Sequence, residues 1–180
     1  MNFKETNIKG TSCCDSATTS DCCATDTSSC GCSNSSSSDK ACSSCNEYGI
    51  KVSAVTLKAQ LKKEFYENLI HDVDDFHFCT NPECDTVYYS SNENETYGQE
   101  CIKSKVACKN EDLKTPLCYC KKLLKENVLA MIEAKEENIP SKIKAIISEG
   151  KTFCEKSNPR GTCCTQDIAT FLEKQGKTFD

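Results

Sequence analysis

Cys118-Tyr119-Cys120 and the later run Cys154-Glu155-Lys156-Ser157-Asn158-Pro159-Arg160-Gly161-Thr162-Cys163-Cys164 decide the fold of the last third of the chain. Cys-x-Cys offers two sulfurs from one turn. The Asn-Pro-x-Gly segment is typical of a turn, with Gly161 free to take a positive φ and backbone amides able to face the sulfurs. A [2Fe–2S] cluster needs four converging thiolates. The pattern therefore predicts such a cluster on Cys118, Cys120, Cys154 and one of the adjacent pair Cys163 and Cys164.

Cysteine usage separates two classes of protein. The 180 residues include 17 cysteines, a density typical of a disulfide framework or of metal ligation. The N-terminus has no apolar segment for export, no run reaches the roughly 18 apolar residues of a membrane span, and the cysteine count is odd. We therefore expect a cytoplasmic, metal-ligating protein without membrane insertion. A secreted disulfide protein is the alternative.

Charge and motifs exclude further classes. The net charge of −5 contains no basic stripe, so nucleic acid is not an expected partner. There is no Gly-x-Gly-x-x-Gly, no P-loop, and neither of the two histidines accompanies a nucleophile pair. The sequence predicts no enzyme in the ordinary sense.

Residues 1–41 contain few large apolar side chains and read as a disordered tail. Three close cysteine pairs lie along this tail, and such pairs suit a soft ion like Cu(I) at low coordination number. Low-complexity drift with incidental cysteines is the alternative. The six residues concerned are Cys13, Cys14, Cys22, Cys23, Cys30 and Cys32.

Residues 42–110 contain two chelating pairs, Cys42-x2-Cys45 and Cys79-x4-Cys84. Four thiolates form a closed, structural zinc site that can stabilise a domain with a thin core. The alternative assigns the first pair to the tail and leaves the second to bind alone or to oxidise. His77 is expected as a packed or surface strand residue, and Cys101 and Cys108 as structural cysteines.

Hydrophobic periodicity predicts an α+β fold. We expect a helix over 56–69 capped by Thr56, strands at 75–79 and 85–90, and a strand-like stretch at 100–109. Helices are expected at 122–136, from Pro140 to Gly150, and from about Cys163 to Gly176. The chain thus divides into a tail (1–41), a small zinc-binding α/β module (42–110) and a helical [2Fe–2S] module (111–180).

These motifs resemble the N-terminal half of CopZ-type copper chaperones, which carry zinc and [2Fe–2S]. The similarity covers both Cys pairs, Phe76-His77-Phe78-Cys79, Val87-Tyr88-Tyr89, Cys118-Tyr119-Cys120 and the Cys154–Cys164 run. The cluster half is also similar to bacterioferritin-associated ferredoxin. The resemblance implies zinc on Cys42, Cys45, Cys79 and Cys84, and it selects Cys164 over Cys163 as the fourth cluster ligand.

Two departures from the family pattern bear on function. Ser43-Ser44 stand where relatives often have a proline, and the 180 residues contain no Met-x-Cys-x-x-Cys loop of the family's copper-binding domain. The Cys-rich tail is then the expected substitute for metal loading.

The resulting hypothesis is a metallochaperone or scavenger for a thiophilic ion, copper first, with a cluster that can reduce Cu(II). A metal-transporting membrane protein or a redox partner would receive the ion or the electron. Alternatives are a small electron-transfer protein like bacterioferritin-associated ferredoxin, and a carrier of mercury or arsenic.

Overall fold

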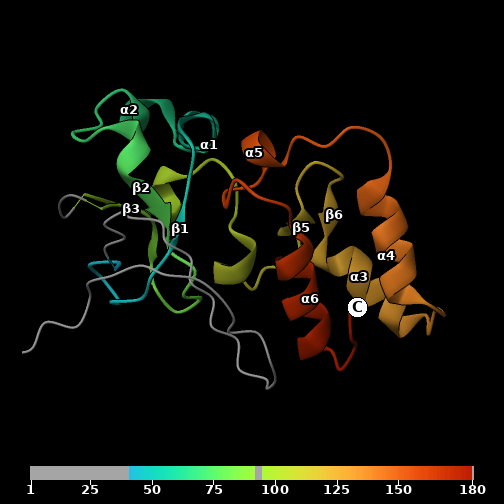
Figure 1. The fold of residues 1–180 in the computed structure, drawn as a ribbon. Coiled ribbons are helices and arrows are strands. Elements are labelled where there is room, and N and C mark those ends of the chain that lie inside the picture. Colours follow the sequence, from blue (N-terminus) through green and yellow to red (C-terminus); the bar gives the residue numbers. More distant parts are fainter. Residues whose placement is uncertain (1–40, 92–94, 180) are drawn as a thin grey trace, which may run out of the picture. The chain divides into compact units, whose positions relative to one another are not determined.

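A computed structural model describes residues 41–91 and 95–179, all of which belong to one compact unit of the chain (Figure 1). Its first part is a four-stranded antiparallel sheet in the order β1-β2-β3-β4. The strands are β1 (Ile50–Lys51), β2 (Phe76–Phe78), β3 (Thr86–Ser90) and β4 (Thr96–Gly98). The predicted strands at 75–79 and 85–90 are therefore confirmed as β2 and β3, which pair with Phe78 opposite Tyr88.

The predicted helix 56–69 is wrong in its start and its length. Helix α1 (Ala54–Gln60) begins two residues earlier, and its cap is Ser53, whose Oγ accepts from the Thr56 N–H at 3.3 Å. Leu61 and Lys62 are extended, and only a short α2 (Lys63–Tyr66) follows. The break arises because Lys62 N–H donates to the Cys101 carbonyl at 2.9 Å, a long-range bond that replaces a helical one.

Residues 100–109 are not a strand. The 3-10 helices η2 (Gln99–Cys101) and η3 (Ala107–Lys109) occupy both ends of this stretch, and a single bridge pairs Ile102 with Leu61 between them. Apolar and polar residues alternate along this stretch because Ile102 and Val106 are buried in the first core. The sheet and η1 (Val73–Asp75) also contribute side chains to that core. The remaining large side chains of that core are Val52, Leu57, Leu61, Phe76, Phe78, Val87, Tyr88 and Tyr97.

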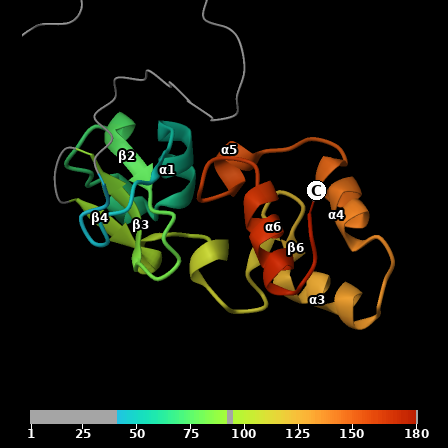
Figure 2. The ribbon, with the colours of Figure 1, turned by 60° about the horizontal axis from the view of Figure 1, so that its bottom comes forward.

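The second part is mainly helical and has its own core (Figure 2). It contains α3 (Lys125–Glu133), α4 (Ile139–Ser148), α5 (Cys154–Ser157) and α6 (Thr165–Lys174). Helices α3 and α6 lie within the predicted helical stretches, and α4 begins one residue before its predicted start. Pro140 lies in the first turn of α4, and Gly150 lies just beyond its end at φ +62°. A two-stranded sheet of β5 (Pro116–Cys118) and β6 (Leu123–Leu124), like α5, was not predicted.

The boundary predicted between residues 110 and 111 stays a prediction, although the separate cores agree with it. The predicted tail, with its three cysteine pairs, lies outside the described residues. None of the described helices is long and apolar enough to cross a membrane.

Candidate metal centres

Four cysteines from two loops, two from each, converge beside the four-stranded sheet. The ligand atoms of Cys42, Cys45, Cys79 and Cys84 all lie within 4.8 Å of one another, and within the described ranges 41–91 and 95–179 no other group of three or more His, Cys, Asp or Glu side chains is so compact. The Sγ atoms of Cys45 and Cys79 are 3.7 Å apart. Metal–sulfur bonds of about 2.3 Å at a tetrahedral ion place two sulfurs about 3.8 Å apart. The donor set therefore fits a tetrahedral thiolate site.

Local backbone geometry forms each half of this first centre. Cys42 and Cys45 lie in a tight turn closed by Asn46 N–H to the Cys42 carbonyl (2.7 Å), with Asn46 in the left-handed region at φ +60°. Cys79 ends β2, and its N–H donates to the Val87 carbonyl at 2.9 Å. Lys109 stabilises the loop that leads from Cys79 to Cys84, because its ammonium donates to the Cys84 carbonyl at 2.9 Å.

Electrostatics in this centre favour a bound cation. Burial raises the pKa of Cys79 far above its ordinary value of 9.0, because a thiolate without a partner is poorly solvated there. Nearby Lys109 opposes that shift. A divalent metal reverses the cost, since thiolates bound to it are stabilised directly. His77 remains outside the donor set: it is buried, stacks on Tyr89 with ring centroids 5.5 Å apart, and lies 3.1 Å from Ser91 Oγ.

The second centre gathers Cys118, Cys120, Cys154 and Cys164 from β5, the following turn, the start of α5 and the start of α6. The Sγ atoms of Cys118 and Cys120 are 3.7 Å apart, again the separation of two thiolates on one tetrahedral metal. Cys164 lies close enough to Cys118, and Cys120 close enough to Cys154, to shift the pKa of the neighbouring thiol. These four thiols are less tightly gathered than those of the first centre, since they do not form a group with all ligand atoms within 4.8 Å of one another.

Thiolate character is unevenly shared in the second centre. A hydrogen bond from the Cys164 thiol lowers the pKa of Cys118 to about 6, with help from the Lys121 N–H. The pKa of Cys164 is raised in return, and burial raises that of Cys154 to about 11. A bound metal would favour the thiolate form of both sulfurs.

The adjacent cysteines 163 and 164 differ in environment. Cys164 is 3% exposed, lies in the second core and faces Cys118, whereas Cys163 is exposed and lies 3.0 Å from Thr165 Oγ1. The arrangement agrees with Cys164 as the fourth ligand. Of the other cysteines, Cys101 is buried and Cys108 is half-buried against the first core. Their structural role stays a prediction.

The turn between Cys154 and Cys164 differs from expectation in one respect. Gly161 does take a positive φ of +73°, and a Cβ there would lie 2.6 Å from Thr56 Oγ1, so glycine is required. However, two amides of the turn are used within it rather than by the sulfurs. Arg160 N–H donates to Asn158 Oδ1 (3.0 Å) and Gly161 N–H to the Asn158 carbonyl (2.8 Å), so both close the turn itself.

Sequence reasoning missed the residues that hold this turn in place. Three buried side chains from the first part donate to its carbonyls: Thr56 Oγ1 to Glu155 O (2.8 Å), Gln60 Nε2 to Lys156 O (2.7 Å) and Tyr88 Oη to Pro159 O (2.6 Å). Both ribbon views accordingly show α5 beside α1 (Figures 1 and 2). We call these three donors the clamp. No local pattern could identify them, since each partner is 71 or more residues away.

Comparison with known proteins agrees with this geometry. Residues 39–103 match the family of CopZ-type zinc-binding domains, a stretch that contains all four cysteines of the first centre. Residues 39–103 therefore carry a zinc-binding domain of the CopZ type.

Two relatives specify that type further. The chain is 30% identical over 124 residues to the copper chaperone CopZ of Archaeoglobus fulgidus, covering 68% of this chain and 57% of that protein. It thus spans little more than half the length of that relative. The X-ray structure of the Archaeoglobus fulgidus CopZ N-terminal domain matches with a TM-score of 0.60 and 26% identity, over 76% of this chain and 98% of that one.

Proposed function

We propose that this protein is a copper metallochaperone that carries zinc on Cys42, Cys45, Cys79 and Cys84 and a [2Fe–2S] cluster on Cys118, Cys120, Cys154 and Cys164. The observation that carries the proposal is the pair of thiolate centres in one compact unit, each with sulfurs at metal-sharing distance. Similarity to a copper chaperone supplies copper as the cargo. This carrier acts by binding and handing over an ion, not by turning over a substrate.

The two centres have different roles in this proposal. The zinc site is closed and structural, because Cys42, Cys79 and Cys84 are buried. The second centre is nearer to solvent, since Cys120 and Cys154 are only half-buried. A bound [2Fe–2S] cluster would supply single electrons, which is what reduction of Cu(II) to Cu(I) requires; an external reductant would replace each electron. The surrounding residues hold the four thiolates and leave this edge accessible.

The cargo site in this proposal is the Cys-rich segment 1–41, whose paired cysteines suit Cu(I). A metal-transporting membrane protein of the cytoplasmic face is the proposed receiver. Mercury or arsenic would meet the same thiolate preference, so the ion is to be established by titration rather than assumed.

A second candidate is a small electron-transfer protein, and the half-buried Cys120 and Cys154 favour it because they would bring a cluster close to a docking partner. Deleting residues 1–41 separates the two candidates. The chaperone proposal expects Cu(I) binding to fall sharply while iron, sulfide and zinc contents stay unchanged. Unchanged Cu(I) binding after the deletion would favour the electron carrier.

The cofactor assignment has its own experiment, independent of cargo. Purified protein should contain two iron and two acid-labile sulfide per chain, one zinc, and a visible absorption spectrum. A colourless protein without acid-labile sulfide would contradict the cluster, and zinc absent from fully folded protein would contradict the first centre.

A further inference from the structure

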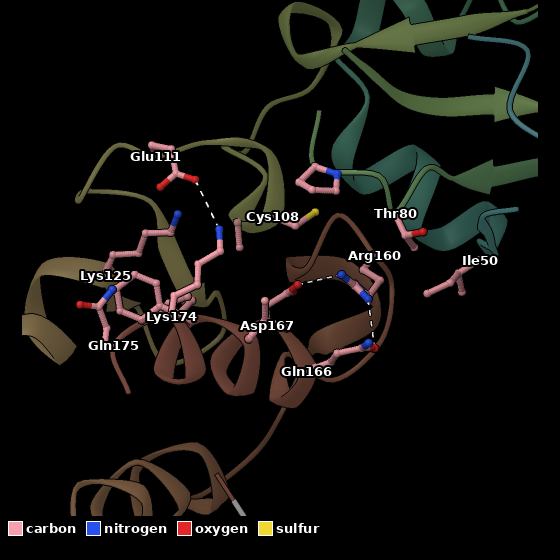
Figure 3. Close-up of a pocket in the computed structure, with 15 residues that line it drawn as sticks. Ile50, Thr80, Cys108, Glu111, Lys125, Arg160, Gln166, Asp167, Lys174 and Gln175 are labelled. Carbon is pink, nitrogen blue, oxygen red and sulfur yellow. Dashed lines mark hydrogen bonds and ion pairs between the residues drawn. The ribbon is translucent and has the colours of Figure 1, made fainter. Parts of the chain in front are cut away.

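A cavity of about 310 Å³ lies between α6, the segments around Cys108 and Leu117, and the Cys79–Cys84 loop, which contributes Thr80 and Pro82 (Figure 3). None of the eight cysteines of the two centres is among its lining residues. That volume is at the lower end of those that hold small ligands. Its lining combines an apolar floor, including Leu117 and Phe171, with an unusual number of charged side chains. These are Glu111, Lys125, Arg160, Asp167 and Lys174.

Pairing of these charges leaves one cation over. Arg160 Nη2 lies 2.7 Å from Asp167 Oδ1, with both side chains 7% exposed, and Lys174 lies 3.7 Å from Glu111 at the exposed side. Lys125 is 4% exposed and has no carboxylate within 4.0 Å among the described residues. The lining therefore carries a net charge of about +1, centred on a buried ammonium.

Lys125 is satisfied only in part. Its ammonium donates to the Asn110 carbonyl and lies 5.7 Å from the centroid of the Phe171 ring, two weak substitutes for a counter-charge. Burial lowers the pKa of Lys125, although Glu111 opposes the shift. A buried ammonium of this kind costs free energy unless an anion accompanies it.

Arg160 adds an unsatisfied donor at the same cavity. Two of its nitrogens are used, by Asp167 and by Gln166 Oε1 at 3.3 Å, but the buried Nε has no hydrogen-bond partner. Figure 3 shows Arg160, Asp167 and Gln166 toward one end of the lining and Lys125 with Lys174 and Glu111 toward the other. Cationic donors thus border the cavity at both ends, and its lining also includes the apolar Phe171 and Leu117.

From this arrangement we propose that the cavity binds a small molecule bearing an oxyanion, a carboxylate or a phosphate, with Lys125 as the residue that neutralises it. The inference does not rest on metal binding or on copper, although Thr80 and Pro82 of the lining belong to the loop between Cys79 and Cys84. Ligand binding would also stiffen α6 and the Arg160 turn, which border the cavity and lead to Cys164 and Cys154.

Titration calorimetry of the intact metal-loaded protein tests the proposal with inorganic phosphate and with succinate, at ionic strength matched by sodium chloride. We expect saturable one-to-one binding of at least one probe; phosphate alone would indicate a phosphate ligand, and succinate alone a carboxylate. Lys125→Met should weaken the Kd at least about tenfold, as expected for loss of a charged hydrogen bond. The control Lys142→Met, which removes an exposed lysine paired with Glu136, should bind like wild type.

A conservative variant and a mapping experiment distinguish a loss of ligand binding from a folding defect in Lys125→Met. Lys125→Arg keeps the charge and should retain binding within about threefold. Chemical-shift changes of the wild-type protein on adding the probe should concentrate at Leu117, Lys125, Arg160 and Phe171. Saturation by neither probe, equal binding by Lys125→Met, loss of binding in Lys125→Arg, or shifts confined to other surfaces would each overturn the proposal.

Discussion

The phenol of Tyr88 donates a 2.6 Å hydrogen bond to the carbonyl oxygen of Pro159, across 71 residues of sequence. Tyr88 is a central residue of β3, in the part of the chain that holds the first thiolate centre, whereas Pro159 lies in the turn between two cysteines of the second. Both partners are buried. The bond therefore ties the position of the second centre to the folding of the first.

Replacing Tyr88 by Phe should destabilise the protein by about 1–3 kcal/mol, because the Pro159 carbonyl would remain buried without a donor. Denaturant unfolding followed by circular dichroism measures this loss. The visible absorption should also bleach faster under a chelator, since the turn that carries Cys154 and Cys164 is held less firmly.

Tyr48→Phe is the matched control, because Tyr48 is 69% exposed and its hydroxyl lies in solvent. Its effect should stay within about 0.5 kcal/mol. If the two variants were equally stable, the clamp would not contribute to stability. If Tyr88→Phe unfolded earlier but bleached at the wild-type rate, the clamp would not position the second centre.

Features that depend on interactions between residues close in sequence could be predicted, whereas features that depend on distant residues could not. Strands β2 and β3 and the three longer helices were predictable, because their patterns are local and Pro140 and Gly150 mark the ends of α4. The chelating pairs were predictable for the same reason, since two to four intervening residues fix the approach of two sulfurs. The grouping of cysteine pairs into two four-cysteine centres was predicted from their spacing and from the family resemblance.

The sequence-based predictions were wrong or silent where a residue interacts with a partner that is distant in the sequence. Thr56 has the residue type of a helix cap, yet its hydroxyl donates to the Glu155 carbonyl and Ser53 caps α1 instead. Leu61 fits the helical stripe, yet it pairs with Ile102 and ends the helix. His71 offered no recognisable partner in sequence, and in the fold its Nδ1 lies 2.6 Å from Glu95 Oε2.

Removal of one ligand from the first centre should unfold the sheet before the helical part. Cys79→Ser leaves three thiolates and a harder donor, so bound zinc should fall from about one to below about 0.2 per chain and the 42–110 region should lose its protection against hydrogen exchange. Cys101→Ser is the control, because Cys101 is equally buried but outside the donor set. Normal zinc content in Cys79→Ser would contradict the assigned site.

Glu95 should make stability depend on acid. Burial opposes ionisation, but hydrogen bonds from Tyr97, His71 and the N–H of Ile70 outweigh it and lower the pKa of Glu95 below its ordinary value of 4.5. A carboxyl with a lowered folded pKa contributes stability above the unfolded value and loses it as pH falls through the folded one. The stabilisation by Glu95 is therefore present at neutral pH and fades below about pH 4.5.

Glu95→Gln checks this expectation. Its unfolding free energy should be lower than that of wild type at about pH 6, and the difference should shrink as the pH falls below about 4.5 and the carboxyl becomes protonated. Both proteins keep the same cysteines, so metal loss in acid affects them alike. A difference that stayed constant, or grew, on acidification would contradict the lowered pKa.

The sharpest test of the second centre compares two neighbouring cysteines. Cys164→Ser should abolish or strongly shift the visible spectrum and lower the iron content, because the buried sulfur that hydrogen-bonds Cys118 is replaced by a hydroxyl, a poor ligand for this soft site. Cys163→Ser should keep iron, sulfide and spectrum close to wild type, since its sulfur is exposed and contacts Thr165. Side chains one position apart at a helix start diverge by about 100°, so both cannot reach the same metal in one conformation. Equal loss in both variants, or loss in Cys163→Ser alone, would show that the fourth ligand is misassigned.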